Sequence, residues 1–122
     1  MATTKESGKV NEQLEPCIFV EFGNGKNVEF MIDTGFNGAL CVPLSLMKEL
    51  GLKTVSEVEI FGIGSHQETV GLAIAEIVWF GQKTEIEVLI NDGNDRLLGS
   101  ELLDGKELRI NYRNRKISVA DR

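Results

Sequence analysis

Short segments in which apolar and polar residues alternate are the feature that most restricts the fold of this chain. In residues 27–32 (NVEFMI) every second side chain is a branched or aromatic apolar one, and Glu29 lies on the opposite face. The run 17–22 (CIFVEF) precedes it across the glycine- and asparagine-rich turn 23–26 (GNGK). Alternation with a period of two on both sides of such a turn predicts a β-hairpin.

Similar patterns recur along the rest of the chain. About seven strands are expected in all, the others lying at 57–60, 69–80 (one long strand, or two with a bend near Ala75), 83–90, 107–112 and 116–120. A helix is expected at 43–50, because Pro43 is a favoured first-turn residue and Gly51 a favoured residue after a helix end. A shorter helical piece is expected at 100–103. Strands outnumber helices and are joined by short turns, so a small, mostly antiparallel barrel or sandwich is favoured over a parallel α/β sheet.

The length of 122 residues fits a single domain. Residues 1–16 are polar, and we expect them to form a loose tail, with the folded domain spanning 17–122. No apolar run approaches the ~20 residues of a membrane span, so no membrane partner is expected. The first fifteen residues lack the apolar segment of an export signal, so a cytoplasmic protein is expected.

The charge and the cysteine content restrict which partners, disulfides and metal sites are expected. Nineteen acidic residues against 13 basic ones give a formal net charge of −6, which makes nucleic acid a poor partner. Cys17 and Cys41 are expected to be buried thiols rather than a disulfide, because a cytoplasmic environment is reducing. His66 is the only histidine and the chain has no CxxC pair, so no metal site is expected.

Several common catalytic motifs are missing or incomplete. A Ser–His or Cys–His centre would need His66, whose place in a glycine-rich turn is more typical of a solvated loop tip. No GxxxxGK[ST] phosphate loop is present, and the dinucleotide-like start at 62–64 lacks its third glycine and the helix. The run 92–94 resembles a calcium loop, but Leu103 stands where that loop needs a glutamate.

An aspartate at the end of an apolar strand is the strongest candidate for chemistry. The run 30–32 (FMI) leads directly into Asp33, Thr34 and Gly35. A carboxylate in this position is poorly hydrated, so its protonation responds to neighbouring groups. A hydroxyl side chain can fix it, and a glycine lets another backbone approach closely. The alternative is an Asx turn in which Asp33 only closes the strand, and an isolated triplet of this kind also arises by chance.

The surroundings of the triplet resemble the retropepsin-like aspartic peptidases, in particular their single-domain bacterial members. Four segments occur in the family's order, namely 30–35 (FMIDTG, with the catalytic Asp-Thr-Gly), 39–43 (ALCVP, an apolar strand), 61–64 (FGIG, the glycine-rich flap) and 96–99 (RLLG, before a short helix). The resemblance spans about residues 16–119. It implies a mostly β fold, a small closed antiparallel barrel of the acid-protease type with one or two short helices.

The resemblance further implies an aspartic endopeptidase that acts as a homodimer on peptides or proteins, with no metal and no cofactor. The family's site takes two Asp-Thr-Gly loops, and this chain has one. Two copies related by a two-fold axis would therefore bring two Asp33 carboxylates together, and like charges at that distance share one proton. The ionised carboxylate would activate a water, and the protonated one would polarise the scissile carbonyl.

The same resemblance gives roles to the residues around Asp33. Asp33, Thr34 and Gly35 would form the catalytic loop, with Thr34 hydrogen-bonded across the dimer and Gly35 open to the substrate backbone. The segment 61–67 would fold over an extended peptide as a lid. Residues expected to contact substrate are Phe36, Asn37, Gly62, Ile63 and Gly64, and those expected to support the loop are Leu97, Leu98 and Gly99.

The chain departs from the viral members of the family at three places. Phe36 stands where they often carry a small residue, so the pocket beside the aspartates is reshaped. Asn37 replaces an aspartate that binds the substrate main chain in those members. The hairpin expected at 108–119 extends beyond the short helix, whereas viral members end sooner and build the dimer sheet from their termini, so the way two copies pair stays open.

Two other interpretations remain. A catalytically silent module with this fold would bind or scaffold a partner, because a fold alone does not guarantee chemistry. A structural β protein would use Asp33 only as a turn cap.

Overall fold

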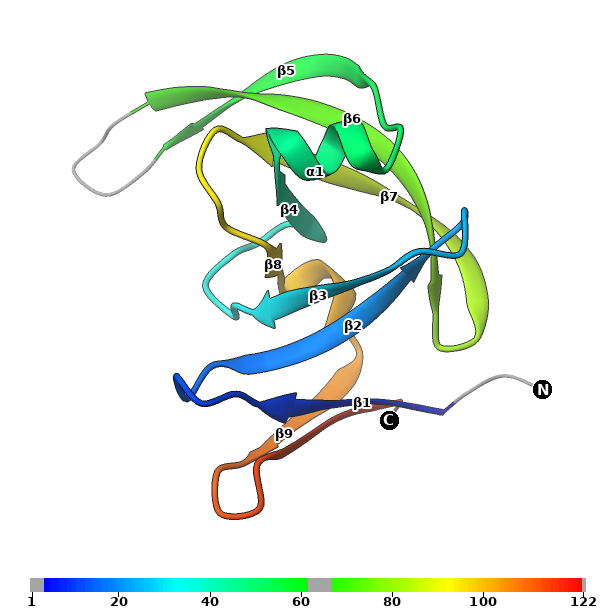
Figure 1. Cartoon of the computed structure of the whole chain (residues 1–122), viewed down its shortest axis with the longest axis vertical. Helices are drawn as coiled ribbons and strands as arrows, with labels where there is room; N and C mark the ends of the chain where they lie inside the picture. The colour runs from blue at the N-terminus through cyan, green and yellow to red at the C-terminus, as the bar shows by residue number, and fades with distance from the viewer. Residues whose placement is uncertain (1–3, 62–66, 122) are drawn as a thin grey trace.

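The computed structural model describes residues 4–61 and 67–121, and for 58–61 and 67–69 it describes the backbone alone. Gly62, Ile63, Gly64 and His66 therefore lie outside the described residues. Figure 1 shows a sheet that curves around its own interior, with one short helix against it. The strands are β1 (Lys5–Val10), β2 (Pro16–Phe22), β3 (Asn27–Ile32), β4 (Leu40–Pro43), β5 (Thr54–Phe61), β6 (Gln67–Trp79), β7 (Gln82–Asn91), β8 (Leu97–Leu98), β9 (Lys106–Asn111) and β10 (Lys116–Asp121). The helices are α1 (Leu44–Glu49) and the single 3₁₀ turn η2 (Ser100–Leu102).

The strands pair in the order β5-β6-β7-β4-β8-β3-β2-β1-β10-β9, and β2 also pairs with β6. The extra pairing sets Glu21 and Phe22 opposite Val78 and Ile77, so that six strands from β6 through β4 and β3 to β2 follow one another in a ring. The pairings among the described residues are antiparallel except for β3 with β8 and β4 with β7. A mostly β, mostly antiparallel fold is thus confirmed, while the closed barrel stays a prediction.

The locally encoded elements form where the sequence predicts them. The hairpin expected at 17–22 and 27–32 is β2–β3, and the last hairpin is β9–β10. The segment expected as one or two strands at 69–80 is the single strand β6. Helix α1 begins after Pro43, which stays extended as the N-cap rather than entering the first turn, and the helix is followed by Gly51 with a positive φ.

The core fills the space inside the curved sheet. Every second residue of β2 and β3 faces inward, as the alternation predicts, and Phe22 packs near Phe30 with ring centroids 6.2 Å apart. Trp79 donates its indole N–H to the carbonyl oxygen of Leu102 at 3.2 Å, which ties η2 to the end of β6. The largest fully buried side chains are Phe30, Ile18, Leu40, Ile77, Leu98, Val20, Val42, Val88 and Val119.

The prediction of a loose tail over residues 1–16 is wrong for residues 5–10, which form β1. This strand lies between β2 and β10, with Ser7 opposite Ser118 and Gly8 opposite Ile18. Only Val10 of β1 is buried, so its backbone pairing on both sides holds it rather than apolar contacts. The Glu6 carboxylate adds a further link by accepting the Phe80 backbone N–H at 2.8 Å.

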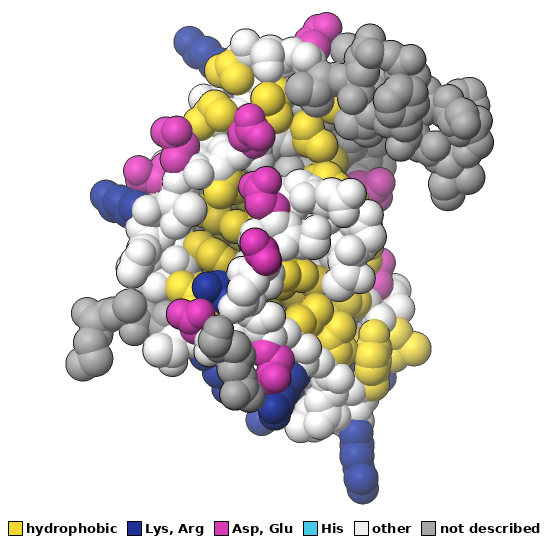
Figure 2. All heavy atoms as spheres, turned by 180° about the vertical axis from the view of Figure 1, so that it is seen from behind, with side chains coloured by type: hydrophobic (Ala, Val, Ile, Leu, Met, Phe, Trp, Pro, Cys, Tyr) yellow, Lys and Arg dark blue, Asp and Glu magenta, His cyan; other side chains and the backbone are white. Residues whose placement is uncertain are grey.

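Both cysteines are free thiols, Cys17 buried and Cys41 half-buried. In the described residues, no helix has the length and apolar character needed to cross a membrane. Figure 2 shows one face of the molecule, on which acidic side chains lie scattered around a strip of exposed apolar atoms. The acidic side chains are therefore spread over the surface on this side.

Candidate active site

Asp33 stands at the point where β3 ends, and strand β8 fixes its backbone there. Met31 and Ile32 pair in parallel with Leu97 and Leu98. The Asp33 N–H donates to the Leu98 carbonyl oxygen at 2.9 Å, so the contact with β8 continues one residue beyond the strand. Leu98 is 0 % exposed, which makes β8 a rigid support. The half-buried Asp33 carboxylate thus leaves the sheet at a fixed place.

The chain turns immediately after Asp33. The Gly35 N–H donates to Asp33 Oδ1 at 2.9 Å, and the Phe36 N–H donates to the Asp33 carbonyl oxygen at 3.1 Å. The first of these bonds makes the Asx turn that was the alternative for this triplet, and the second closes a backbone turn over the same residues. The turn is compatible with chemistry as well, because a carboxylate oxygen can accept more than one hydrogen bond.

The loop from Asp33 to Ala39 rests on the segment that follows β8. Three backbone N–H groups of this segment donate into the loop. Gly99 donates to Ala39 at 2.9 Å, Ser100 to Phe36 at 2.8 Å and Glu101 to Gly38 at 3.2 Å. Residues 33–39 and 97–101, which are about sixty positions apart in the sequence, therefore form one backbone network.

Gly99 is required by the closeness of this packing. A Cβ at this position would overlap the carbonyl oxygens of Gly38 and Phe36 and would touch the Phe36 ring. Because two of these three groups are backbone atoms, they cannot move aside as a flexible side chain would. The structure thus brings together the predicted catalytic loop and the predicted support residues Leu97, Leu98 and Gly99.

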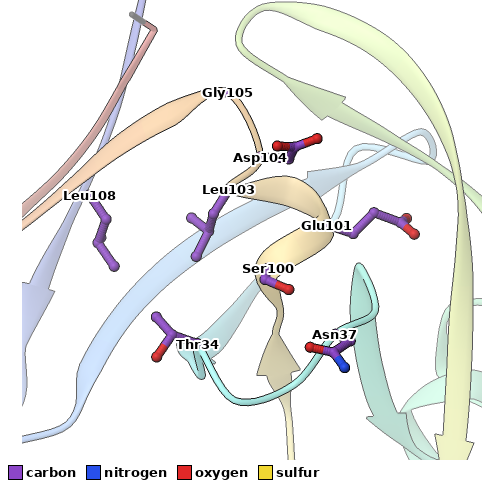
Figure 3. A pocket seen from close by; sticks show the side chains of 8 residues that line it. All are labelled: Thr34, Asn37, Ser100, Glu101, Leu103, Asp104, Gly105 and Leu108. Carbon is purple, nitrogen blue, oxygen red and sulfur yellow. The ribbon is translucent and has the colours of Figure 1, made fainter.

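Thr34 and Asn37 are exposed and line an open depression of about 610 Å³. Its other wall comes from η2 and the start of β9, with Leu103 and Leu108 as the apolar members. Figure 3 shows the side chains of Thr34, Leu103 and Leu108 facing a common space.

A second cavity, of about 540 Å³, lies beside Phe36 and Leu97. Its apolar lining comes from α1, β4 and β7 as well, and β5 and β6 contribute further lining residues. The full lining is Phe36, Cys41, Leu44, Thr54, Glu57, Val70, Gly71, Leu89, Ile90, Asn91, Asp92 and Leu97. Most of these residues were not predicted as site residues, because the alternation along a strand shows only on which face of that strand a residue lies.

The cysteine in this cavity is not set up as a nucleophile. Burial raises the pKa of Cys41, which the hydrogen bond from Asn91 Nδ2 at 3.1 Å only partly offsets, and Asp95 raises it further. Burial likewise raises the pKa of Cys17, with Glu29 and Glu15 acting in the same direction. A thiol of raised pKa stays protonated at neutral pH and is a poor nucleophile.

The expected lid lies only partly within the described residues. Strands β5 and β6 pair from Thr54 with Ala73 to Phe61 with Gln67, and their paired ends reach out at the upper left of Figure 1. The predicted substrate contacts Gly62, Ile63 and Gly64 come after the last of these pairs, outside the described residues.

Solved structures similar to this chain include the following three. A retropepsin-like aspartic protease from Rickettsia conorii superimposes with a TM-score of 0.68 at 19% identity, covering 96% of this chain and 90% of that one. The EIAV protease, solved with the inhibitor HBY-793, gives a TM-score of 0.60 at 18% identity and covers 77% of this chain and 89% of its own. The Simian Foamy Virus (mac) protease gives 0.53 at 18% identity, with 72% and 91% covered.

The chain has a retropepsin-like fold. The bacterial structure matches nearly all of it, whereas about a quarter of the chain lies outside the two viral matches. No family model matches the sequence, and no curated relative matches it either. Since the identities lie below 20%, these similarities establish the fold, and the chemistry has to be argued from the site.

Proposed function

We propose that this protein is an aspartic endopeptidase whose active site forms between two copies of the chain. The observation that carries the proposal is the Asp33-Thr34-Gly35 turn, held on Leu98 and Gly99 by backbone hydrogen bonds within a retropepsin-like fold. An aspartate used only to end a strand would not need support from a segment so distant in the sequence. Such support fits a carboxylate that has to be held in a fixed position.

The chemistry follows from two Asp33 carboxylates that share one proton. The ionised carboxylate removes a proton from a water, and the water oxygen attacks the carbonyl carbon of the scissile peptide bond. The protonated carboxyl gives its proton to the carbonyl oxygen, which produces a neutral gem-diol. The C–N bond then breaks as the nitrogen takes a proton from a carboxyl group and a hydroxyl proton returns to the pair. Activity should fall at both low and high pH, because the pair works with a single proton.

One chain supplies half of this site. Asp92, Asp95, Asp104 and Asp121 are not followed by Thr-Gly or Ser-Gly, so no second loop of this type exists in the sequence. The second carboxylate has to come from another copy, which makes the interface isologous.

Strand β9 is the part of the molecule on which we expect the second copy to pack. The strands next to the chain ends, β1 and β10, already pair with each other and with β2 and β9. Among the described strands β9 pairs only with β10, so its other edge is open for strand pairing. Leu108 of β9 lines the same depression as Thr34, so a copy seated there would adjoin the catalytic loop.

The test is cleavage of a peptide library between pH 4 and 7 by the wild-type protein beside Asp33→Asn. Sedimentation of both proteins over a range of concentrations, with and without a hydroxyl-bearing peptide mimic of the gem-diol, reports the dimer. We expect cleavage by the wild type alone, and a dimer that the mimic stabilises. Equal activity of the two proteins, or cleavage by a species that stays monomeric, would remove the proposal.

The hydrogen bond from Gly35 to Asp33 favours one other interpretation, in which Asp33 serves the turn and the domain only binds partners or has a structural role. The silent binding module predicts a monomer with no cleavage, and the structural role predicts that Asp33→Asn leaves every binding property unchanged.

A further inference from the structure

The cavity beside Phe36 combines an apolar floor with carboxylates at its rim. Its apolar lining includes Leu89, Ile90 and Leu97 together with Phe36, all of them buried or half-buried. Glu57 in the middle of β5 and Asp92 just after the end of β7 line it as well, and both are exposed. A cavity of about 540 Å³ accommodates a long side chain.

The described residues that line this cavity include acidic side chains but no basic ones, and the nearest basic residues in the sequence are Lys53 and Arg96, next to the lining residues Thr54 and Leu97. In the sequence, the stretch 54–82, which includes strands β5 and β6, has no Lys or Arg and four Glu. An anionic side chain entering the cavity would therefore be repelled by the lining carboxylates of Glu57 and Asp92, while a cation would be attracted by them.

Both carboxylates are held by defined backbone. Asn91 fixes the turn that carries Asp92, since its Oδ1 accepts the Gly93 N–H at 2.8 Å and its Nδ2 donates to the Asp95 carbonyl oxygen at 3.1 Å. Glu57 of β5 pairs with Gly71 of β6, and both residues line the cavity. Because Gly71 has no side chain, nothing at this position screens the glutamate from the cavity. The rim charge is thus part of the built structure of the cavity.

We infer that this cavity binds a lysine or arginine side chain of the peptide substrate, so that the enzyme cleaves beside a basic residue. The inference rests on the proposed function for the identity of the ligand as a peptide. The methylene stem of the basic residue packs on the apolar floor, and its cationic group lies between Glu57 and Asp92. Because both carboxylates are exposed, their joint contribution is about tenfold in selectivity rather than many thousandfold.

The test uses peptides that are identical except at one position near the cleaved bond, where arginine, lysine, norleucine or glutamate is placed. The full-length protein is assayed for kcat/KM on each, and a scan over the flanking positions finds the one that enters the cavity. The variant Glu57→Gln/Asp92→Asn removes the rim charge. The variant Glu12→Gln/Glu85→Gln is the matched control, since it removes two exposed acids that do not line the cavity.

We expect arginine and lysine peptides to be preferred over norleucine by about tenfold in the wild type and in the control. In Glu57→Gln/Asp92→Asn the ratio should fall to about two or less, and in the wild type it should shrink as salt is added. A wild-type ratio near one at every position overturns the inference. So does a ratio that survives in the rim variant, or one that the control loses equally.

Binding of the same peptides, measured by calorimetry on Asp33→Asn, separates this inference from the proposed function. If the wild type cleaves none of the peptides, the proposed function fails. A basic preference in binding that depends on Glu57 and Asp92 would then still support the cavity's specificity, and equal binding of all four peptides would refute it.

Discussion

Replacing Gly99 by alanine should disrupt the support of the loop that carries Asp33. Gly99 has an extended backbone (φ −103°, ψ −177°), so alanine meets no conformational strain of its own at this position. The added methyl group instead overlaps the carbonyl oxygens of Gly38 and Phe36. The same carbonyls accept the N–H groups of Glu101 and Ser100, so relieving the overlap stretches both hydrogen bonds.

The size of the effect follows from these contacts. Overpacking a rigid site costs about 1–3 kcal/mol, and each strained backbone hydrogen bond adds about 1 kcal/mol. A total of about 3–5 kcal/mol is a large part of the roughly 6–18 kcal/mol expected for a chain of 122 residues. With a typical urea dependence, the unfolding midpoint should fall by about 2 M.

Urea unfolding followed by tryptophan fluorescence measures this directly, since Trp79 is buried and bonded to Leu102. Gly25→Ala is the control, because Gly25 has a positive φ of 89° but no atom lies close to where its Cβ would be. It therefore tests backbone strain without steric overlap. Strain alone should cost it about 1–2 kcal/mol. If Gly99→Ala proves as stable as the wild type, or more stable than Gly25→Ala, the close packing described for this loop is incorrect.

Three further outcomes are expected. The free energy of unfolding of Asp33→Asn should lie within about 1 kcal/mol of the wild-type value, because an amide oxygen can still accept the Gly35 N–H. Asp33→Ala should be less stable by about 1 kcal/mol more. Equal losses for the two variants in urea unfolding would argue against the turn. Leu108→Ser should weaken self-association at least about tenfold in sedimentation while circular dichroism shows an intact fold, and unchanged association would exclude β9 as the interface. Burial raises the pKa of Cys17 and Cys41 above 9.0, so the folded state keeps these protons to a higher pH than the unfolded chain does. The stability of the fold should therefore hold below pH 9 and decline above it. In a pH series of thermal melts, the Cys17→Ala/Cys41→Ala protein should lack that decline.

Local patterns made much of the fold predictable. The β2–β3 and β9–β10 hairpins combine alternating residues with a turn, and α1 lies between Pro43 and Gly51, so each carries its own signal. Strand β1 carries none, since it forms through pairing with distant residues, as in the bond from the Val10 N–H to the Arg115 carbonyl oxygen at 3.0 Å. Strand β8 is two residues long, too short for any periodicity to appear.

The candidate site was likewise predictable in part from the sequence. Asp33 and its support at Leu98 and Gly99 could be proposed from motifs that occur in a fixed order. The cavity lining could not, because it depends on how separate strands meet. Leu89 is an example, for it lies between two buried residues of β7 and its place in the cavity follows from the pairing of β7 with β4 and β6. The link from Asn91 to Cys41 joins residues fifty positions apart, and no local pattern encodes it.

Mixing the wild-type protein with Asp33→Asn tests most directly whether two chains build one active site. The two proteins are unfolded together at equal amounts, refolded and assayed at a fixed total concentration, after sedimentation has shown that each associates equally well alone. If each site needs an ionisable Asp33 from both copies, random pairing leaves about one quarter of the activity of pure wild type. A value of about one half would mean that each chain acts by itself, and the two-chain site would be refuted.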